Sequence, residues 1–472
     1  MGGASIRRGA KLFEYLTYMH QSIGDLYQLL DRNPLKLVEF LETKVTAEES
    51  PTGLSRLLFS LAIMRDITKE LRTCCIEAHK WSFTSRAVSI EEDWSIRGSV
   101  LWSLTIPKLC RCEPPVQAVL STSLLSPENL LLKSCLCVAK QLLVSISTAL
   151  QETLRSAQLR ARGVDVELVG EQVIQRASSE LFEKLRSLEK QPLIKLLPNI
   201  RNPVRSLKRL TYELHSRKYR VRWIERLLRI SKELLALEDI TEGVVDALIH
   251  RGLTYAAVSR AIKFYSWRLY EIYVLKLVMN VLKSMFPLVR VRCRGRKFLI
   301  ELYDNRISVL YNMPPRSEGV PSRVGDGKAQ GVLRDSLPRD VLEHSAGRPD
   351  ITIIKYTNEG RRVIVIETKF STSPSYLTQA RFKLLAYMYE YRAALGILAF
   401  PGVIRSRGAF EEEEEETVRL LKGAVERGGV ELTLLNGARA YLLPIEPARR
   451  SEHKNMEILW RALQLLKSSF SK

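Results

Sequence analysis

The chain has few of the residues that usually build metal clusters. Its 472 residues contain six histidines and seven cysteines, and the histidines show neither an H-E-x-x-H motif nor another close ligand spacing. The cysteines include two C-x-C pairs, Cys110/Cys112 and Cys135/Cys137, whereas structural zinc sites use C-x2-4-C. Buried thiols are therefore expected. Zinc is the less favoured alternative, and a disulfide would fit a hyperthermophilic host. Only ten asparagines and abundant arginine weakly favour a thermophile.

Long apolar runs and nucleotide-binding loops are also missing. The run from Leu130 to Leu150 is interrupted by Lys133, Lys140 and Gln141, so no membrane span is expected. The N-terminus lacks the pattern of a signal peptide, which makes a cytoplasmic protein without a membrane partner the default expectation. The stretch 325–329 resembles a P-loop, but it fails the G-x4-G-K-S/T spacing. Any NTPase motor would therefore be a separate subunit.

Positive charge is abundant. The net charge is +21 and the pI is about 9.7, which favours polyanionic partners because Lys and Arg displace the counterions of phosphates. Between Arg201 and Lys232 there are eleven Lys or Arg and two acids, with Tyr212, Tyr219 and Trp223 interleaved. This pattern is typical of a nucleic-acid-tracking surface, and equally of a basic helix with aromatic core residues. The candidate nucleic-acid contacts are Arg217, Lys218, Arg220 and Arg222.

The first 245 or so residues are expected to be mostly helical, because apolar residues recur with helical spacing. The stretch 86–120 is less regular and is expected to hold a few strands. The expected helices are Lys11–Leu30, Pro34–Thr43, Leu54–His79, Pro127–Leu154 and Val166–Leu197.

The most informative segment is a hairpin between residues 350 and 369. Asp350 opens an apolar run, residues 357–360 form a turn, and a second apolar run leads to Glu367. With a four-residue loop Tyr356 pairs with Arg361, and in that register Asp350 lies opposite Glu367 with Cβ atoms about 5 Å apart. Strand alternation places Glu367 and Lys369 on one face.

Facing carboxylates repel each other, and a divalent cation removes the conflict. Mg²⁺ prefers such oxygen ligands, and Mn²⁺ is expected to substitute for it. Lys369 could then hold or deprotonate an attacking water, or stabilise a pentavalent phosphate, and its apolar flank suggests a desolvated lysine suited to act as a base. The alternative is an exposed strand carrying a common E-x-K pair. The Val363–Ile366 run argues against it, because it is typical of a strand buried on both faces.

Pro349-Asp350 and Glu367-Thr368-Lys369 resemble the signature of the PD-(D/E)xK nuclease superfamily. The resemblance implies an α-β-β-β-α-β core with a metal site on the central hairpin and an acidic ligand on the first helix. Glu271, in a helical pattern from Tyr255 to Met285, stands at that place, and Tyr270-Glu271 resembles the corresponding helix of McrC-like restriction subunits. The alternative for Glu271 is an ion pair with Arg268 or Lys276. Tyr311-Asn312, after a strand, is also McrC-like.

The flanking segments are expected to complete this core. They are strands at Val289–Leu302, 306–311, 394–400, 430–435 and 439–444, and helices at Pro374–Tyr391 and 411–427. The loop 312–347 is expected to be flexible or substrate-clamping. Gln379, Lys383 and Tyr387 share one face of the second helix. The resemblance implies contact with the metal site or DNA, and the alternative is an ordinary amphipathic helix.

These observations together predict an α/β protein with a restriction-endonuclease-like core behind a mostly helical N-terminal region. The expected domains are 1–85, 86–250, a nuclease domain at 251–445 and a C-terminal helix at 446–472. The expected activity is Mg²⁺-dependent hydrolysis of phosphodiesters, most readily in DNA, with Asp350, Glu367 and Glu271 as metal ligands and Lys369 as the catalytic lysine. A separate NTPase subunit and a homodimer are expected partners. The alternatives are a non-catalytic nucleic-acid-binding or assembly protein, and a restriction subunit that cleaves only with its NTPase partner.

Overall fold

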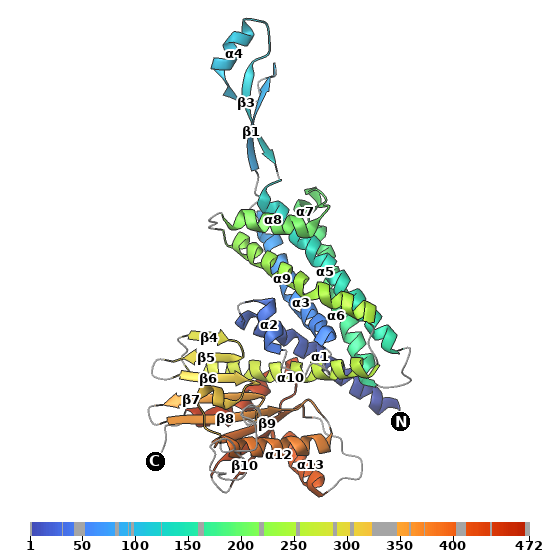
Figure 1. Cartoon of the computed structure of the whole chain (residues 1–472), viewed down its shortest axis with the longest axis vertical. Coiled ribbons are helices and arrows are strands. Elements are labelled where there is room, and N and C mark those ends of the chain that lie inside the picture. The colour runs from blue at the N-terminus through green and yellow to red at the C-terminus, as the bar shows by residue number, and fades with distance from the viewer. Residues whose placement is uncertain are drawn as a thin grey trace, which may run out of the picture. The chain divides into compact units, whose positions relative to one another are not determined.

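The structure is a computed structural model, and it places helices in the N-terminal half of the chain and a mixed eight-stranded sheet in the C-terminal half (Figure 1). It describes residues 2–30, 32–41, 52–80, 85–92, 94–95, 99–123, 125–158, 165–216, 221–251, 255–286, 290–302, 306–322, 347–357, 360–371, 373–402, 412–434 and 437–467. Packing divides the chain into two compact units. Unit 1 comprises Met1–Ala62, Gln151–Ile174 and Ala247–Lys472, and unit 2 comprises Ile63–Leu150 and Gln175–Asp246.

Unit 2 is built mainly from helices. Its elements include most of α3 (Thr52–Lys80), α5 (Pro127–Gln158), α6 (Asp165–Glu189) and α9 (Arg222–Arg251), with the shorter α7 (Pro192–Leu196) and α8 (Pro203–His215). The expected single helix over 166–197 is wrong, because the chain breaks after Glu189. It restarts with Pro192 in the first helical turn of α7, where proline's missing N–H costs nothing.

Helix α5 qualifies the expectation that no segment reaches membrane-spanning length. Its stretch Pro127–Thr153 is long and apolar enough to cross a membrane by length and composition. However, 61% of the qualifying window is buried inside the protein, and Leu131, Leu132 and Cys135 have no exposed surface. The core helix of a soluble protein satisfies the same criterion.

The expected strands near residues 86–120 form a small antiparallel sheet in unit 2. Its order is β1 (Ser85–Glu92), β3 (Val116–Ser123) and β2 (Ser99–Val100), and α4 (Trp102–Leu109) connects β2 to β3. The hydroxyl of Thr105 donates to the carbonyl of Val116 and accepts from its N–H, both at 3.0 Å, which fixes α4 on β3. Several large apolar side chains here are at least 41% exposed: Trp94, Trp102, Leu104, Ile106 and Leu109.

Unit 1 contains the eight-stranded sheet, whose order is β10-β11-β9-β8-β7-β6-β5-β4. Five strands form an antiparallel meander: β4 (Arg290–Arg294), β5 (Lys297–Glu301), β6 (Arg306–Tyr311), β7 (Ile351–Thr357) and β8 (Gly360–Thr368). β9 (Leu395–Phe400) and β11 (Arg439–Pro444) continue the sheet in parallel to β8, and β10 (Val430–Thr433) is the antiparallel edge.

The first part of this meander corrects one expectation. The sequence predicts one strand over 289–302, and the structure instead forms a hairpin of β4 and β5. Gly295 makes the turn with a φ of 55°, a conformation that glycine adopts without steric cost. Arginines occupy every second position from Arg290 to Arg296, across the turn, so the sequence pattern does not show where the first strand ends.

Helices cover the sheet. α12 (Pro374–Glu390) and α13 (Glu412–Arg427) pack through Leu377, Leu384 and Leu421 against a core that includes Leu310, Val365 and Leu398 of the strands. α10 (Tyr255–Met285) packs against α1 (Gly2–Leu29), α14 (Glu452–Leu463) and β8. Successive side chains of a strand point to opposite faces of the sheet. Every residue from Val363 to Thr368 is buried, so both faces of β8 are covered.

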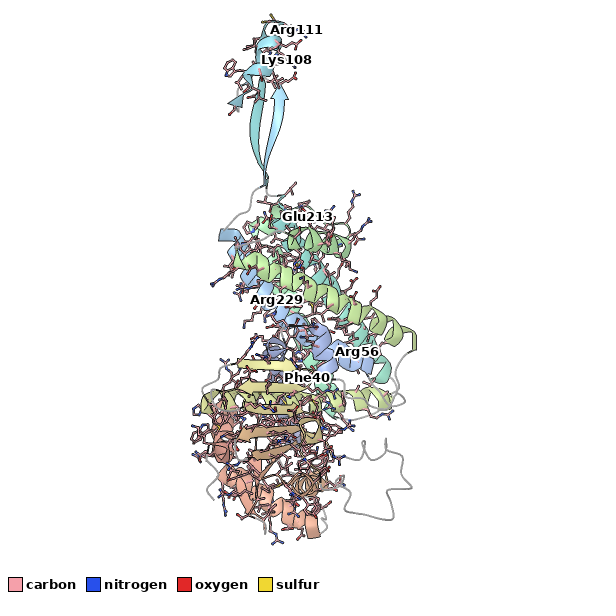
Figure 2. All side chains as sticks on the ribbon, turned by 60° about the vertical axis from the view of Figure 1, so that its left-hand side comes forward. Phe40, Arg56, Lys108, Arg111, Glu213 and Arg229 are labelled. Carbon is pink, nitrogen blue, oxygen red and sulfur yellow. The ribbon has the colours of Figure 1, made fainter. Side chains whose placement is uncertain are left out.

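Helix α2 (Pro34–Leu41) anchors the N-terminal segment to the sheet through one aromatic side chain. Phe40, labelled in Figure 2, stacks on Tyr311 of β6 with ring centroids 4.7 Å apart and planes 3° apart. It also meets Phe298 of β5 edge to face, at 5.7 Å. All three side chains are fully buried, so the N-terminal helices are part of the same core as the sheet.

Candidate functional site

The hairpin of β7 and β8 has the register that the sequence predicts. Tyr356 pairs with Arg361 and Ile351 with Ile366, which brings Asp350 and Glu367 to the same end of the two strands. Both carboxyl-bearing residues are buried, Asp350 to 6% exposure and Glu367 to 0%. The apolar strands thus carry two acids to one buried end of this central strand pair.

Thr368 holds the side chain of Asp350. The backbone N–H of Thr368 donates to Oδ2 of Asp350 at 2.7 Å, and its hydroxyl donates to the same oxygen at 3.0 Å. The neighbouring Lys369 is fixed through its own N–H, which donates to the carbonyl of Ala399 on β9 at 2.9 Å. The middle residue of the Glu-Thr-Lys motif therefore positions the first acid, a role that sequence reasoning missed.

Two lysines meet at Glu367. Nζ of Lys369 lies 2.6 Å from Oε1 of Glu367 and 3.8 Å from Oδ2 of Asp350. Nζ of Lys383, from α12, donates to the same Oε1 at 2.9 Å. The other oxygen, Oε2 of Glu367, is buried and has no hydrogen-bond partner among the described residues. Oε1 of this carboxylate thus contacts two ammonium groups, while Oε2 is still able to accept a hydrogen bond or bind a cation.

The site shifts the ionisation of its members. Burial, with the nearby charge of Asp350, raises the pKa of Glu367 to about 7, although Lys369 and Lys383 act in the opposite direction. Burial disfavours the charged form of Lys369, but Asp350 and Glu367 outweigh it and the pKa of Lys369 is raised. The pKa of Lys383 is raised for the same reason, mainly by Glu367.

Lys369 is desolvated, as its apolar flank predicts, and burial alone would lower its pKa. Two carboxylates close to Nζ outweigh that effect and raise the pKa, which favours the cation over a base. As a cation, Lys369 is suited to bind an anionic oxygen.

Glu271 lies in a separate hydrogen-bonded network. Its Oε2 is 2.5 Å from Nη1 of Arg268 and accepts from the hydroxyl of Tyr311 at 2.7 Å. The side-chain amide of Asn312 donates to the same oxygen at 3.0 Å, and the backbone N–H of Asn312 donates to the carbonyl of Asp350 at 2.9 Å. The expected alternative partner Arg268 is present, and Asn312 links Glu271 to the chain beside Asp350.

The potential metal ligands are few. Within the ranges given above, no group of three or more His, Cys, Asp or Glu has an arrangement that could hold a metal ion. Glu271 therefore does not join Asp350 and Glu367 in a three-carboxylate cluster, and its role as a ligand stays a prediction.

Cys74, Cys75 and Cys135 are buried as expected, whereas Cys110 and Cys112 are exposed. Burial raises the pKa of Cys74 and of Cys75 to about 12.

The segment before Asp350 is clamped by α12. The N–H of Gly347 donates to Oε1 of Glu390 at 3.1 Å, and Tyr391 donates to the carbonyl of Gly347. Tyr387, 8% exposed, donates from its hydroxyl to the carbonyl of Arg348 at 3.1 Å. A Cβ on Gly347 would lie 2.4 Å from Cε1 of Tyr387, so only glycine fits. On the helix face that the sequence predicts, Lys383 contacts Glu367 and Tyr387 contacts the backbone just before Asp350. Gln379, on the same face, is exposed.

The basic stretch 201–232 divides into buried and exposed parts. Trp223 is 1% exposed, so it is a core residue, while Tyr212 is 85% exposed on α8. Nε of Arg226 lies 3.1 Å from Glu70 of α3, and Arg229 is 3.4 Å from the same carboxylate (Figure 2 labels Arg229). These pairs stabilise helix packing. Of the four candidate nucleic-acid contacts, Arg222 is exposed, and Arg217, Lys218 and Arg220 lie outside the described residues.

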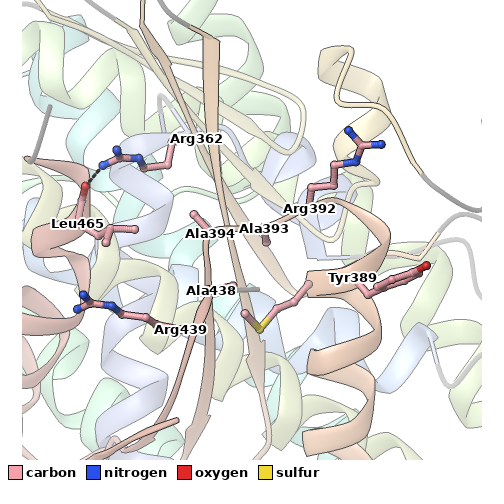
Figure 3. Close-up of a pocket in the computed structure, with 10 residues that line it drawn as sticks. Arg362, Tyr389, Arg392, Ala393, Ala394, Ala438, Arg439 and Leu465 are labelled. Atoms are coloured by element: carbon pink, nitrogen blue, oxygen red, sulfur yellow. Dashed lines mark hydrogen bonds between the residues drawn. The ribbon is translucent and has the colours of Figure 1, made fainter. Parts of the chain in front are cut away.

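A cavity of about 340 Å³ lies away from the acidic pair (Figure 3). Arg362, Ala394 and Arg439 line it at the starts of β8, β9 and β11, whereas Glu367 lies near the other end of β8. Arg362 donates to the carbonyl of Leu465, and Arg439 lies 3.4 Å from Glu431. These arginines already have protein partners.

Comparison with known proteins gives a likeness in structure but none in sequence. No family model matches the chain, and no curated protein matches it. The chain is similar to a chain in a refined half-complex from the tetradecameric assembly of Thermococcus gammatolerans McrB AAA+ hexamers with bound McrC. The identity is 11%, the TM-score is 0.31, and the similarity covers 92% of this chain and 76% of that chain. At this identity and TM-score, the likeness assigns neither a family nor a role to any residue.

Proposed function

We propose that this protein is a metal-dependent nuclease that hydrolyses phosphodiester bonds in DNA. The observation that carries the proposal is the buried Oε2 of Glu367, which lacks a hydrogen-bond partner in the part of the chain that the structure describes. A buried acceptor without a partner is costly, and a bound cation would satisfy it. Glu367 lies beside Asp350 and Lys369, which are the residue types that phosphodiester chemistry needs.

The donor set fits a hard divalent cation. Asp350 and Glu367 offer carboxylate oxygens at the same end of adjacent strands, and Mg²⁺ commonly binds one or two carboxylates together with waters and substrate phosphate. These two residues would hold the ion. When bound, Mg²⁺ or Mn²⁺ would polarise the phosphoryl oxygen and promote ionisation of the attacking water.

The chain's own residues supply the remaining functions. Lys369 carries its positive charge within 3.8 Å of both carboxylates, where it would bind a non-bridging phosphate oxygen and offset the charge that develops there. Lys383 donates to Oε1 of Glu367 and would so orient that carboxylate, with Oε2 left for the cation. Thr368 fixes the side chain of Asp350, and Asn312, held by Glu271, fixes its backbone.

The order of elements supports the proposal. Helix α10 precedes the antiparallel strands β6, β7 and β8, and α12 then leads to β9, which is parallel to β8. Two further strands, β4 and β5, stand between α10 and β6. If these are an extension, the remaining elements follow the α-β-β-β-α-β order that the resemblance of the Asp350 and Glu-Thr-Lys motifs implies.

The test is cleavage of end-labelled single- and double-stranded DNA by the wild type, Asp350→Asn and Lys369→Ala, with Mg²⁺, Mn²⁺ or EDTA. Cleavage that needs the cation and is lost in both variants supports the proposal. Matched binding by all three proteins would show that the variants are folded. No cleavage, with tight and salt-sensitive binding by the wild type, would instead support the non-catalytic nucleic-acid-binding protein.

We further propose that the nuclease is a cytoplasmic subunit that works with a separate NTPase. The chain carries no P-loop, and the McrC chain of the similar structure is bound to McrB AAA+ hexamers. The exposed apolar side chains around α4, among them Trp94 and Trp102, form a candidate surface for such a subunit. Cleavage that appears only when an NTPase encoded beside this chain is added with GTP or ATP would support this version. Equal cleavage with and without that subunit would contradict it.

A further inference from the structure

We propose that Trp267 and Tyr376 form a base-stacking subsite beside Lys369, and that the substrate is therefore single-stranded DNA, or duplex DNA with an unpaired nucleotide at the scissile bond. This inference rests on the proposed nuclease function and names its substrate class. Trp267 belongs to α10 and Tyr376 to α12, so the two helices that flank the proposed site each contribute one ring.

The two rings form a stack that leaves an aromatic surface open. Their centroids are 6.0 Å apart and their planes are inclined by 19°. Trp267 is 40% exposed, whereas its aromatic neighbours on the same helix, Tyr265 and Tyr270, are 7% and 0% exposed. A tryptophan that served only to join two helices would be expected to bury most of its surface. A bound nucleobase would cover this exposed part of Trp267.

The stack also lies next to the charge that would bind phosphate. Nζ of Lys369 is 5.8 Å from the centroid of the Tyr376 ring. Lys369 in turn contacts both carboxylates of the proposed site. A nucleotide joins its phosphate to its base through a single sugar, so a phosphate held at Lys369 would bring its own base, or the next one, to the aromatic pair.

This arrangement selects for an unpaired base. In a duplex, both faces of each base are covered by neighbouring base pairs, so an external ring can stack only on a base that has been released. Stacking on aromatic side chains is the usual way in which proteins bind single strands, and it tolerates any sequence because every base has a π face. We therefore expect the protein to prefer single strands over duplex DNA, with little preference among base sequences.

The experiment uses the full chain carrying Asp350→Asn, so that binding is measured without cleavage. The probe is a single-stranded oligonucleotide with 2-aminopurine, whose fluorescence is quenched on stacking, and the matched duplex is the reference. The added variants are Trp267→Ala, Tyr376→Ala and Trp267→Phe. Tyr389→Ala, which removes a 64% exposed aromatic from the same helix as Tyr376, is the control.

We expect Trp267→Ala and Tyr376→Ala to weaken single-strand binding by about five- to one-hundred-fold and to abolish quenching, with a much smaller effect on the duplex. Trp267→Phe should retain most of the quenching because it keeps a ring, and Tyr389→Ala should behave as the parent. Retained quenching in Trp267→Ala, or an equal loss on single strands and duplex, would overturn the proposal.

The same variants separate this inference from the proposed function. If the chain with Asp350 intact never cleaves, but quenching depends on Trp267, the stacking subsite stands and the nuclease fails. If the chain cleaves single strands and duplex equally well, and Trp267→Ala leaves both rates unchanged, the nuclease stands and the subsite is overturned. Thermal unfolding of Trp267→Phe and Trp267→Ala would show whether a loss reflects stacking or misfolding.

Discussion

Thr368 donates two hydrogen bonds to one oxygen of Asp350, from its backbone N–H at 2.7 Å and from its hydroxyl at 3.0 Å. The backbone bond follows from the hairpin register, but the second bond requires threonine or serine at this position. Thr368→Val keeps the shape and removes only the hydroxyl. A hydrogen bond to a charged group contributes roughly 1.5–3 kcal/mol, so we expect at least a ten-fold fall in the cleavage rate constant.

The control for that prediction is Thr368→Ser, which retains the hydroxyl and should keep most of the activity. The measurement is single-turnover cleavage at saturating Mg²⁺. If valine and serine had the same rate constant, the hydroxyl would have no part in holding Asp350.

The two lysines at Glu367 should not be equivalent. The side chain of Lys369 is 14% exposed and contacts both acids, whereas that of Lys383 is 45% exposed and contacts Glu367. We expect Lys369→Ala to lower the cleavage rate constant by at least 10²- to 10³-fold, as for other groups that stabilise transition-state charge. Lys383→Ala should lower it by about ten-fold or less, because an exposed ion pair contributes little. A larger loss in Lys383→Ala would reverse the two assignments.

Binding of the cation should depend on the carboxylate of Glu367. Titration calorimetry of the wild type with Mn²⁺ should show a site that is absent in Glu367→Gln, because the amide removes the negative charge but keeps the size of the side chain. Dialysis against EDTA should abolish cleavage, and added Mg²⁺ or Mn²⁺ should restore it. Unchanged Mn²⁺ binding in Glu367→Gln would exclude this residue as a ligand.

Gly347 should be intolerant of any side chain. An added Cβ would lie 2.4 Å from Cε1 of Tyr387 and 2.6 Å from Oε2 of Glu390, so these side chains or the backbone that leads to Asp350 would have to move. We expect Gly347→Ala to destabilise the protein by about 1–3 kcal/mol and to lower cleavage. Gly423→Ala is the control, since its Cβ would meet only Cγ2 of Val430 at 3.9 Å and the helix would gain alanine's higher propensity. Urea unfolding of both variants tests this directly, and equal stability would contradict it.

Phe40 should contribute strongly to stability although it lies far from the motif in sequence. It is 1% exposed and stacks on Tyr311, which donates to Glu271. Phe40→Ala should cost about 3–5 kcal/mol of unfolding free energy, because it removes a buried ring and leaves a cavity. Phe382→Ala, at a ring that is 49% exposed, should change stability by about 0.5 kcal/mol or less. A small effect of Phe40→Ala in urea unfolding would show that α2 is not part of this core.

Several elements could be predicted from the sequence because their patterns are local. Helix α10 has the predicted bounds, and β6 and β11 agree to the residue. The register of β7 and β8 follows from the length and composition of the turn that joins them. The hairpin of β4 and β5 was missed, because the arginine alternation continued across Gly295.

The sequence by itself determined that two acids and a lysine meet at one end of a buried hairpin, since strand pairing and alternation are properties of neighbouring residues. Only the tertiary structure decided that Lys383 reaches Glu367, that Glu271 pairs with Arg268, and that Trp267 stacks on Tyr376. These contacts join separate elements or depend on how an element is buried, and local periodicity does not encode either. The same reason explains the pKa of Lys369, because burial alone would lower it and the carboxylates of Asp350 and Glu367 raise it.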